Sequence, residues 1–115
     1  MKRGEIRLVD LDPARGSEAA KVRPAVVVSN DVANETATRL KRGVVTVVPV
    51  TTNVQRVYPF QVLVTSIASG LPHDSKAQAE QVRSVAVERV GRVVGTLPPA
   101  SLTQLDNALR LHLQL

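Results

Sequence analysis

The 115-residue sequence contains no cysteine, and this absence excludes two kinds of site. Structural disulfides need cysteine pairs, and thiolate zinc sites need cysteine ligands. Tryptophan is also missing, and Tyr58 and Phe60 are the only aromatic residues. Modules that stack the bases of single-stranded nucleic acid usually present several aromatic side chains. The sequence therefore argues against such a platform, and any nucleic-acid recognition is expected to depend on hydrogen bonds and phosphate contacts.

Long apolar runs are missing as well. No segment approaches the roughly 20 apolar residues that a membrane-spanning helix needs. The charged N-terminal residues Met1–Arg7 do not open into the apolar region of a signal peptide. We therefore expect a cytoplasmic protein without membrane attachment. The length predicts one domain, residues 1–115, built around a single core.

Basic residues outnumber acidic residues, 15 to 10, and the formal net charge is +5. A charge of this sign favours a polyanionic partner such as nucleic acid. The basic residues are scattered along the chain instead of forming a tail. Any phosphate-binding surface must therefore be assembled by the fold.

Valine is abundant and occurs in short segments bounded by Gly, Pro, Asn and Asp, which predicts a mainly β protein of the α+β class. The predicted strands are Gly4–Asp10, Pro24–Ser29, Gly43–Thr51, Gln61–Thr65, Lys76–Arg83 and Arg92–Gly95. Two long connections, Leu11–Arg23 and Asn30–Arg42, are predicted as loops. A loop of about a dozen residues in a compact domain is usually functional or mobile.

The C-terminal segment is predicted to be a helix. Pro98 and Pro99 precede it, and Ser101 with Gln104 matches a capping box. Two adjacent apolar stripes follow at helical spacing: Leu102, Leu105, Leu109 and Leu113, and then Ala108, Leu111 and Leu115. The second stripe has two interpretations, burial on the chain's own sheet or packing against a second subunit.

The segment Gly16–Asn30 is the most informative part of the chain. It places Glu18 and Arg23 in a turn immediately before a strongly β-forming run. Pro24 restricts Arg23 to an extended backbone, so the guanidinium projects from a stiffened strand entrance. Loop residues at the mouth of a rigid strand are well placed for catalysis, because the strand holds the backbone while the side chains stay accessible.

Ordered matches along nearly the whole chain resemble the MazF/PemK-type toxins, the endoribonuclease half of type II toxin–antitoxin pairs. The matching segments are Gly4–Ile6, Val9–Pro13, Gly16–Glu18, Arg23–Ser29, Val48–Asn53, Tyr58–Val62, Glu80–Ser84 and the C-terminal helix. The resemblance implies a compact SH3-like β-barrel with a C-terminal helix, and a homodimer with an RNA groove across it. It further implies sequence-specific, metal-independent cleavage of single-stranded RNA that leaves a 2′,3′-cyclic phosphate and a 5′-hydroxyl.

The resemblance assigns catalytic positions to Arg23 and Thr51, and in some members to Glu18. The chemistry of these side chains agrees with attack by a ribose 2′-hydroxyl on the adjacent phosphate. The guanidinium of Arg23 can hold two phosphate oxygens, and the Thr51 hydroxyl can donate one hydrogen bond to the same phosphate. Glu18 is the only nearby carboxylate able to act as a base. Its alternative role is an ion pair with Lys21 or Arg23 that orders the loop.

Six further residues are candidate RNA contacts: Ser29, Asn30, Thr52, Lys76, Gln81 and Arg83. We expect Ser29, Asn30 and Thr52 to sit beside the proposed site, although Ser and Asn at strand ends commonly satisfy turn backbone. Gln81 and Arg83 can instead belong to an exposed strand face, and Lys76 can be a solvated surface charge.

No His, Asp and Glu residues have the spacing of a metal site, and no Gly-rich run precedes a helix as a nucleotide-phosphate loop requires. We therefore expect no cofactor and no metal. The expected partners are single-stranded RNA and a MazE-like antitoxin whose inhibitory segment is acidic or occupies the RNA path. Two other functions stay open: a gyrase poison of the CcdB kind, which would use a Trp-containing tail that this chain lacks, and an RNA-binding barrel without turnover.

Overall fold

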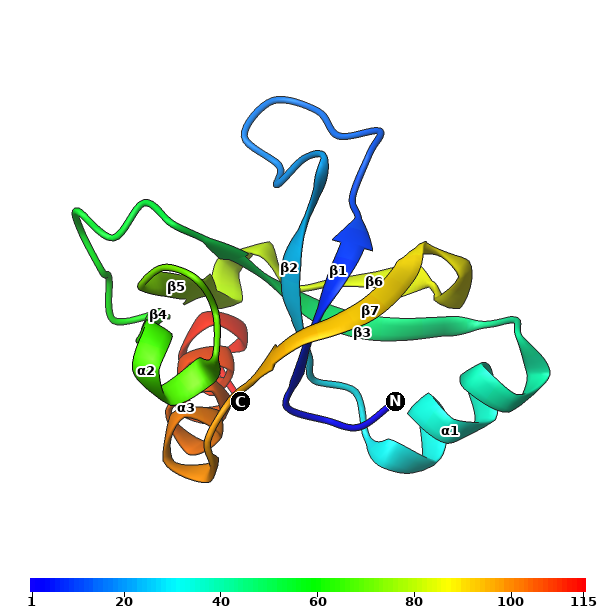
Figure 1. The fold of residues 1–115 in the computed structure, drawn as a ribbon. Helices are drawn as coiled ribbons and strands as arrows, with labels where there is room; N and C mark the ends of the chain where they lie inside the picture. Colours follow the sequence, from blue (N-terminus) through cyan, green and yellow to red (C-terminus); the bar gives the residue numbers. More distant parts are fainter.

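The computed structural model describes residues 1–115, and it has a mixed α+β architecture. Seven antiparallel strands form one sheet in the order β4-β5-β3-β2-β1-β7, with β6 pairing to β3 beside this path (Figure 1). The strands are β1 (Glu5–Asp10), β2 (Val22–Val27), β3 (Val44–Thr51), β4 (Gln61–Val64), β5 (Ser75–Gln78), β6 (Arg83–Ala86) and β7 (Val90–Thr96). The predicted α+β class is confirmed. Strand pairing does not close the sheet into a ring, and the barrel description stays a prediction.

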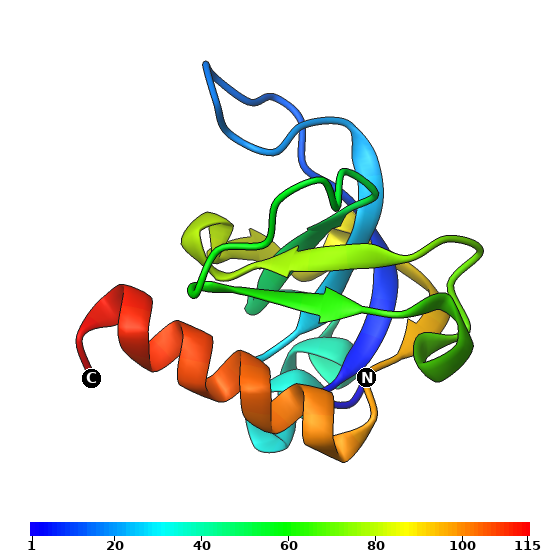
Figure 2. The same cartoon turned by 90° about the vertical axis from the view of Figure 1, so that its left-hand side faces the viewer.

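Three helices accompany the sheet: α1 (Asp31–Leu40), the short α2 (Ser66–Ser69) and α3 (Pro99–Leu113). Helix α3 packs against β4, whereas α1 packs against β3 on the opposite side of the molecule (Figure 1). Figure 2 shows α3 running along one edge of the fold. None of the helices combines the length and the apolar character that crossing a membrane would require.

The core consists of two apolar clusters, because the central strands are buried on both faces. In β2, Ala25 belongs to one cluster and Val26 to the other, and in β3 Val47 and Val48 divide in the same way. Successive side chains of a strand point to opposite faces, so a strand covered on both faces needs a continuous apolar run. This explains why the valines cluster instead of alternating with polar residues.

The predicted strand Lys76–Arg83 is wrong, because the segment divides into β5, a 3-10 turn at Ala79–Gln81, and β6. Both strands pair with β3: Val50 lies opposite Ala77, and Val47 lies opposite Arg83. The chain therefore advances six residues, from Ala77 to Arg83, while the paired residue of β3 changes by only three, from Val50 to Val47. The three-residue turn takes up the difference and moves the chain from one half of β3 to the other.

The predicted loop Asn30–Arg42 is also wrong, because most of it forms helix α1. Asn30 is the N-cap, and its side-chain oxygen accepts a hydrogen bond from the Ala33 N–H at 2.9 Å. Lys41 ends the helix in a left-handed conformation, with φ of 53°. The Thr-rich composition suggested a loop since threonine is a weak helix former. The cap and the burial of Asn34 and Ala37 outweigh that preference.

Helix α3 is confirmed, but its predicted capping box is wrong. The helix begins three residues earlier than the capping box predicts: Pro98 is the N-cap instead of Ser101, and no side chain caps the first turn. Leu105 and Ala108 are fully buried, whereas Leu113 from the first stripe is 49% exposed. From the second stripe, Leu111 and Leu115 are 56% and 84% exposed. The outer side of α3 therefore presents apolar side chains to solvent.

Candidate functional site

Arg23 and Thr51 meet on neighbouring strands at one end of the sheet. Antiparallel pairing sets Ala25 of β2 opposite Pro49 of β3, and Arg23 lies two residues before Ala25 while Thr51 lies two residues after Pro49. Opposed residues of antiparallel strands point to the same face. Both side chains line one open pocket of about 210 Å³, together with Thr52. The structure thus brings together three of the residues predicted for the site.

The side chain of Arg23 is held by one hydrogen bond. Its Nε–H donates to the carbonyl oxygen of Ala20 at 2.9 Å, and the residue is partly buried. No protein acceptor engages its two terminal nitrogens. A guanidinium fixed at Nε and free at both terminal groups is arranged to bind two oxygens of one phosphate.

Thr51 ends β3, and its hydroxyl oxygen accepts a hydrogen bond from the Asn53 N–H at 3.3 Å. The hydroxyl proton is still available for donation, because a threonine hydroxyl both accepts and donates. The exposed side chain of Thr52 borders the same pocket. The pocket therefore offers a charged fork and hydroxyl donors to an anion.

Glu18 lies outside this pocket, on the loop between β1 and β2 that projects from the sheet (Figure 1). Its carboxylate accepts a hydrogen bond from the Arg15 N–H at 3.1 Å and lines a separate pocket of about 350 Å³. The alternative ion pair with Lys21 or Arg23 is wrong, because neither partner forms a salt bridge. Glu18 orders its own turn through Arg15 instead.

Gln81 and Arg83 hold the loop that carries Glu18. The Gln81 side-chain oxygen accepts from the Ala19 N–H at 3.1 Å, and its amide donates to the Ser17 carbonyl at 2.9 Å. Arg83 donates to the Leu11 carbonyl at 3.2 Å. The two side chains, which were expected to face RNA or solvent, are engaged with the protein backbone, while still bordering the Glu18 pocket.

Lys76 is buried, with 7% of its surface exposed, so its description as a solvated surface charge is wrong. Its Nζ donates to the Arg56 carbonyl at 2.6 Å and lies 5.9 Å from the centre of the Tyr58 ring. Pairing of β3 with β5 sets Lys76 directly opposite Thr51. Thr51 therefore shares a pocket with Arg23 of β2 on one side and pairs with Lys76 of β5 on the other.

Sequence reasoning missed Arg56 and Tyr58, which border a second pocket that Lys76 also lines. The pocket, of about 540 Å³, is lined by Asn53, Gln55, Arg56, Tyr58 and Lys76. The signal was present in the sequence, since the only two aromatic residues of the chain lie next to Arg56 in one short connection. Their rings stack in parallel, with centroids 5.3 Å apart.

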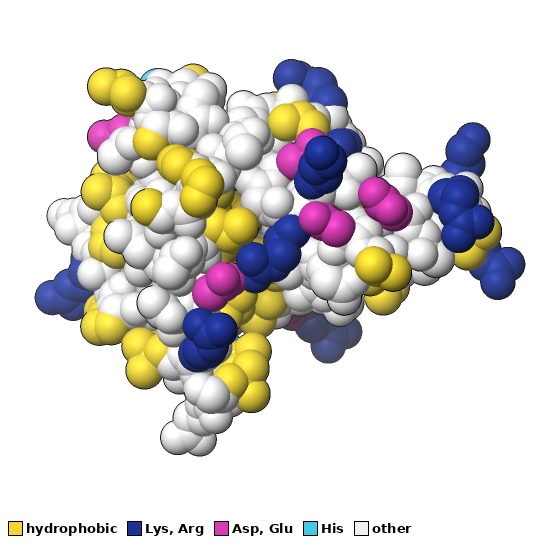
Figure 3. Space-filling model, turned by 90° about the horizontal axis from the view of Figure 1, so that it is seen from below, with side chains coloured by type: hydrophobic (Ala, Val, Ile, Leu, Met, Phe, Trp, Pro, Cys, Tyr) yellow, Lys and Arg dark blue, Asp and Glu magenta, His cyan; other side chains and the backbone are white.

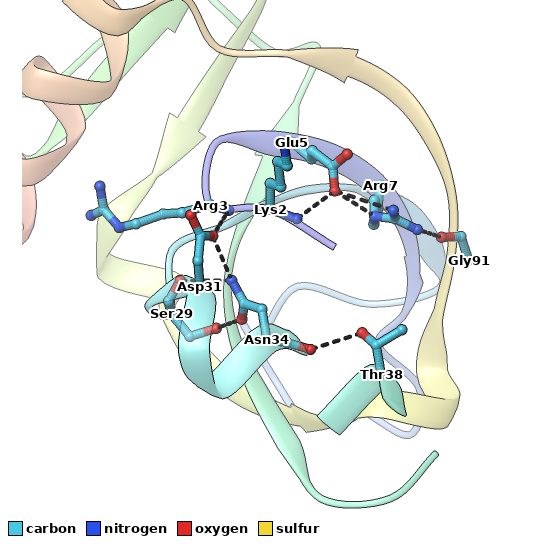
Figure 4. Close-up of polar contacts among 9 residues, drawn as sticks. All are labelled: Lys2, Arg3, Glu5, Arg7, Ser29, Asp31, Asn34, Thr38 and Gly91. Atoms are coloured by element: carbon cyan, nitrogen blue, oxygen red, sulfur yellow. Dashed lines mark hydrogen bonds and ion pairs between the residues drawn. The ribbon is translucent and has the colours of Figure 1, made fainter. Parts of the chain in front are cut away.

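The expectation that Ser29 and Asn30 lie beside Arg23 is wrong. They follow the far end of β2, and six residues of extended chain span roughly 20 Å. The Ser29 hydroxyl donates to the Asn34 side-chain oxygen at 2.5 Å (Figure 4). The same hydroxyl accepts from the Thr46 N–H at 3.0 Å. These two residues join α1 to the sheet in this structure.

Charged groups near the N-terminus extend the same network (Figure 4). The Arg3 N–H donates to the Asp31 carboxylate at 2.6 Å, and Glu5 pairs with Arg7 at 3.1 Å. Burial by itself raises the pKa of Glu5, but hydrogen bonds from the Lys2 N–H and from Arg7, with the positive charge of Arg7, outweigh it. The pKa of Glu5 therefore lies below its usual range.

The cationic side chains do not merge into one patch on the face opposite the projecting loop. Figure 3 shows Lys and Arg side chains at several places on this face, some beside Asp and Glu side chains and several gathered at its right-hand end. No three His, Asp or Glu side chains form a group that could hold a metal ion. The candidate site consists of the pocket of Arg23 and Thr51, the pocket of Tyr58 and Lys76, and the pocket of Glu18 and Gln81.

The family model for the PemK-like, MazF-like toxins of type II toxin–antitoxin systems matches residues 2–113. The chain is 66% identical over 115 residues to endoribonuclease MazF9 of Mycobacterium tuberculosis, with 100% of this chain and 98% of the relative covered. It is 40% identical over 100 residues to the endoribonuclease toxin MazF of Escherichia coli, with 86% of this chain and 81% of the relative covered.

The fold is similar to those of solved toxin structures. Against the Mycobacterium tuberculosis toxin MazF-mt6, the TM-score is 0.78 at 26% identity, with 96% of this chain and 97% of that chain covered. A mycobacterial endoribonuclease solved in complex with its cognate antitoxin gives a TM-score of 0.77 at 23% identity, over 100% and 96% of the two chains. The chain belongs to the PemK-like, MazF-like toxin family.

Proposed function

We propose that this protein is the toxin of a type II toxin–antitoxin system and an endoribonuclease. It cleaves single-stranded RNA at a specific sequence without a metal ion, through attack of a ribose 2′-hydroxyl on the adjacent phosphate. The products are a 2′,3′-cyclic phosphate and a 5′-hydroxyl. The observation that carries the proposal is the shared pocket of Arg23 and Thr51, in a chain whose relatives are endoribonucleases.

Arg23 stabilises the phosphorane, which carries more negative charge than the substrate phosphate. Its terminal nitrogens have no protein acceptor, so both can bind phosphate oxygens without breaking an existing bond. Donors that are already oriented toward developing charge are commonly the largest single contribution to catalysis. Thr51 adds one hydroxyl hydrogen bond to the same phosphate from the neighbouring strand.

Glu18 is our candidate for the base that takes the 2′-hydroxyl proton. It is exposed on the β1–β2 loop and borders the Gln81 pocket instead of the Arg23 pocket. A base must come within about 3 Å of the proton it removes, although such contacts can form only once substrate binds. Normal turnover in a Glu18→Gln variant would remove Glu18 from the mechanism.

The decisive experiment incubates the wild type and Arg23→Ala with mixed-sequence single-stranded RNA in EDTA and identifies fragment ends by mass spectrometry. We expect cyclic phosphate ends from the wild type, and a loss of roughly 100- to 1,000-fold in cleavage rate for Arg23→Ala. Arg23→Lys is the matched variant, because it keeps the charge and loses the planar fork. Cleavage that needs added magnesium would contradict the metal-independent mechanism.

The family assignment also supports two protein partners, an antitoxin and a second copy of the toxin. The exposed Leu63 and Leu111 border an open groove between β4 and α3 and supply apolar surface for a dimer. The net charge of +5 favours an acidic inhibitory segment on the antitoxin. We further infer that residues 1–115 form one domain. We also infer that its sheet has the architecture of an SH3-like β-barrel.

The two other functions are less well supported. A CcdB-like gyrase poison would not need the Arg23 and Thr51 pocket, and the chain contains no Trp for a Trp-bearing tail. An RNA-binding protein without turnover would leave RNA intact while binding it in a salt-dependent way. Intact RNA after incubation with folded, antitoxin-free wild type would favour that second function.

A further inference from the structure

We propose that the pocket lined by Asn53, Gln55, Arg56, Tyr58 and Lys76 binds one RNA base next to the scissile phosphate and helps to set sequence specificity. This inference rests on the proposed ribonuclease function. It revises the expectation, drawn from the small number of aromatic residues, that base stacking has no part in recognition. The volume of about 540 Å³ lies within the roughly 300–1,000 Å³ usual for ligand sites.

The pocket is positioned beside the pocket of Arg23 and Thr51. Lys76, which lines it, lies directly opposite Thr51 in the β3–β5 pairing. Opposed residues of an antiparallel pair have Cα atoms about 5 Å apart, so the two pockets are neighbours along the sheet. A nucleotide adjacent to a phosphate held by Arg23 is therefore within reach of this pocket.

Tyr58 supplies the stacking surface. Its ring is parallel to that of Phe60, with 2° between the planes, and this pairing holds the ring in place from one side. The residue is still 41% exposed. The exposed Arg56 side chain lies over the ring at 5.4 Å from the centroid, so it can yield to an incoming base and stack on its outer side.

The polar groups of the pocket are mainly donors. Lys76 uses one N–H on the Arg56 carbonyl and keeps two, and Arg56 uses one on the Tyr58 oxygen. Tyr58 accepts that bond, so its own O–H is free to donate. Asn53 accepts from the Gln55 N–H at 3.3 Å, which leaves its amide group as a donor. A donor-rich pocket favours a base edge that carries keto oxygens, as in guanine or uracil.

Tyr58 is the only tyrosine, and the chain has no tryptophan, so intrinsic fluorescence reports on this pocket alone. The probe is an RNA oligonucleotide that contains the mapped cleavage sequence, with a 2′-deoxy sugar at the scissile position and a 3′ dye for anisotropy. We expect tyrosine emission to fall with the same Kd that anisotropy gives. N-acetyltyrosinamide titrated with the same RNA corrects for absorption by the bases.

Variants test specificity directly, by sequencing the fragments produced from mixed-sequence RNA. Tyr58→Leu should lower kcat/KM by roughly 10- to 100-fold and lose the preference at one position of the site, because a base–aromatic stack is removed. Tyr58→Phe keeps the ring and removes only one donor, so its kcat/KM should fall by less than tenfold and by less than that of Tyr58→Leu. Arg56→Gln should weaken discrimination for a keto base, whereas Arg42→Gln, a distant exposed change of equal charge, should not.

Three outcomes are distinguishable. Quenching together with a lost base preference supports the pocket. RNA that binds and is cleaved while tyrosine emission stays constant, or a folded Tyr58→Leu protein with wild-type cleavage preferences, overturns it and leaves the ribonuclease function intact. A folded wild type that neither binds nor cleaves RNA refutes the proposed function, and this inference with it.

Discussion

The side-chain oxygen (Oε1) of Gln81 accepts a hydrogen bond from the backbone N–H of Ala19 at 3.1 Å. The side-chain nitrogen (Nε2) of Gln81 donates a hydrogen bond to the Ser17 carbonyl oxygen at 2.9 Å. One side chain from the β5–β6 turn therefore holds the backbone on both sides of Glu18. This relationship connects a turn to the loop that carries the candidate base, across more than 60 positions of sequence.

We predict that Gln81→Ala frees this loop. Each neutral hydrogen bond contributes about 1 kcal/mol, so the global stability should fall by only about 1–2 kcal/mol. Hydrogen exchange at the Ala19 amide should accelerate much more than exchange in the sheet, because its acceptor is lost. Gln78→Ala, whose side chain forms no hydrogen bond, is the matched control. An unchanged exchange rate at Ala19 would show that the hydrogen bond from Ala19 to Gln81 is not maintained in solution.

Asn30→Ala separates the structural role of Asn30 from the expected RNA contact. Loss of the N-cap of α1 should lower the free energy of unfolding by about 1 kcal/mol, as measured by urea denaturation. RNA cleavage should be unaffected, because Asn30 lies beyond the far end of β2 from Arg23. A reduced kcat/KM at unchanged stability would instead make Asn30 an RNA contact.

Glu5 should make stability depend on pH in the acidic range. Its folded-state pKa is lowered, so the ionised form is favoured by folding. The resulting stability is present above the ordinary glutamate pKa near 4.5 and is lost as pH falls through the lower folded-state pKa. Unfolding free energies measured from neutral pH downward should therefore decline less steeply in Glu5→Gln than in the wild type. Parallel curves for the two proteins would contradict this assignment.

Leu111→Lys tests the dimer that the outer side of α3 suggests. Leu111 is 56% exposed and borders the β4–α3 groove, so the charge should weaken association without entering the core. Light scattering should show a shift from dimer toward monomer. Thr103→Lys, also exposed on α3 but outside the groove, should not cause this shift. A Leu111→Lys protein that remains dimeric would argue against this interface.

The local features of the candidate site could be predicted from the sequence. Pro24 and the following β-forming residues predicted that Arg23 stands at a strand entrance, and β2 confirms this. The stripe of Leu105 with its neighbours predicted α3 and the side that it buries. The capping-box pattern at Ser101 misled, because proline at the first helical position offers an equally good start.

Features that depend on contacts between residues far apart in the sequence could not be predicted from it. Nothing near Lys76 in the sequence indicates burial, and only its position opposite Thr51, with the Arg56 carbonyl as acceptor, explains why its charge lies inside. Similarly, Gln81 and Arg83 looked like outward-facing residues until the three-residue turn set them against the β1–β2 loop.

The sequence by itself determined the composition of the core, most of the strand-forming segments and the C-terminal helix. These follow from local preferences and from apolar patterning, which act over a few neighbouring positions. The tertiary structure decided which residues share a pocket: Arg23 with Thr51, Lys76 with Tyr58, and Gln81 with the Glu18 loop. Strand register joins residues far apart in the chain, and no local preference specifies it.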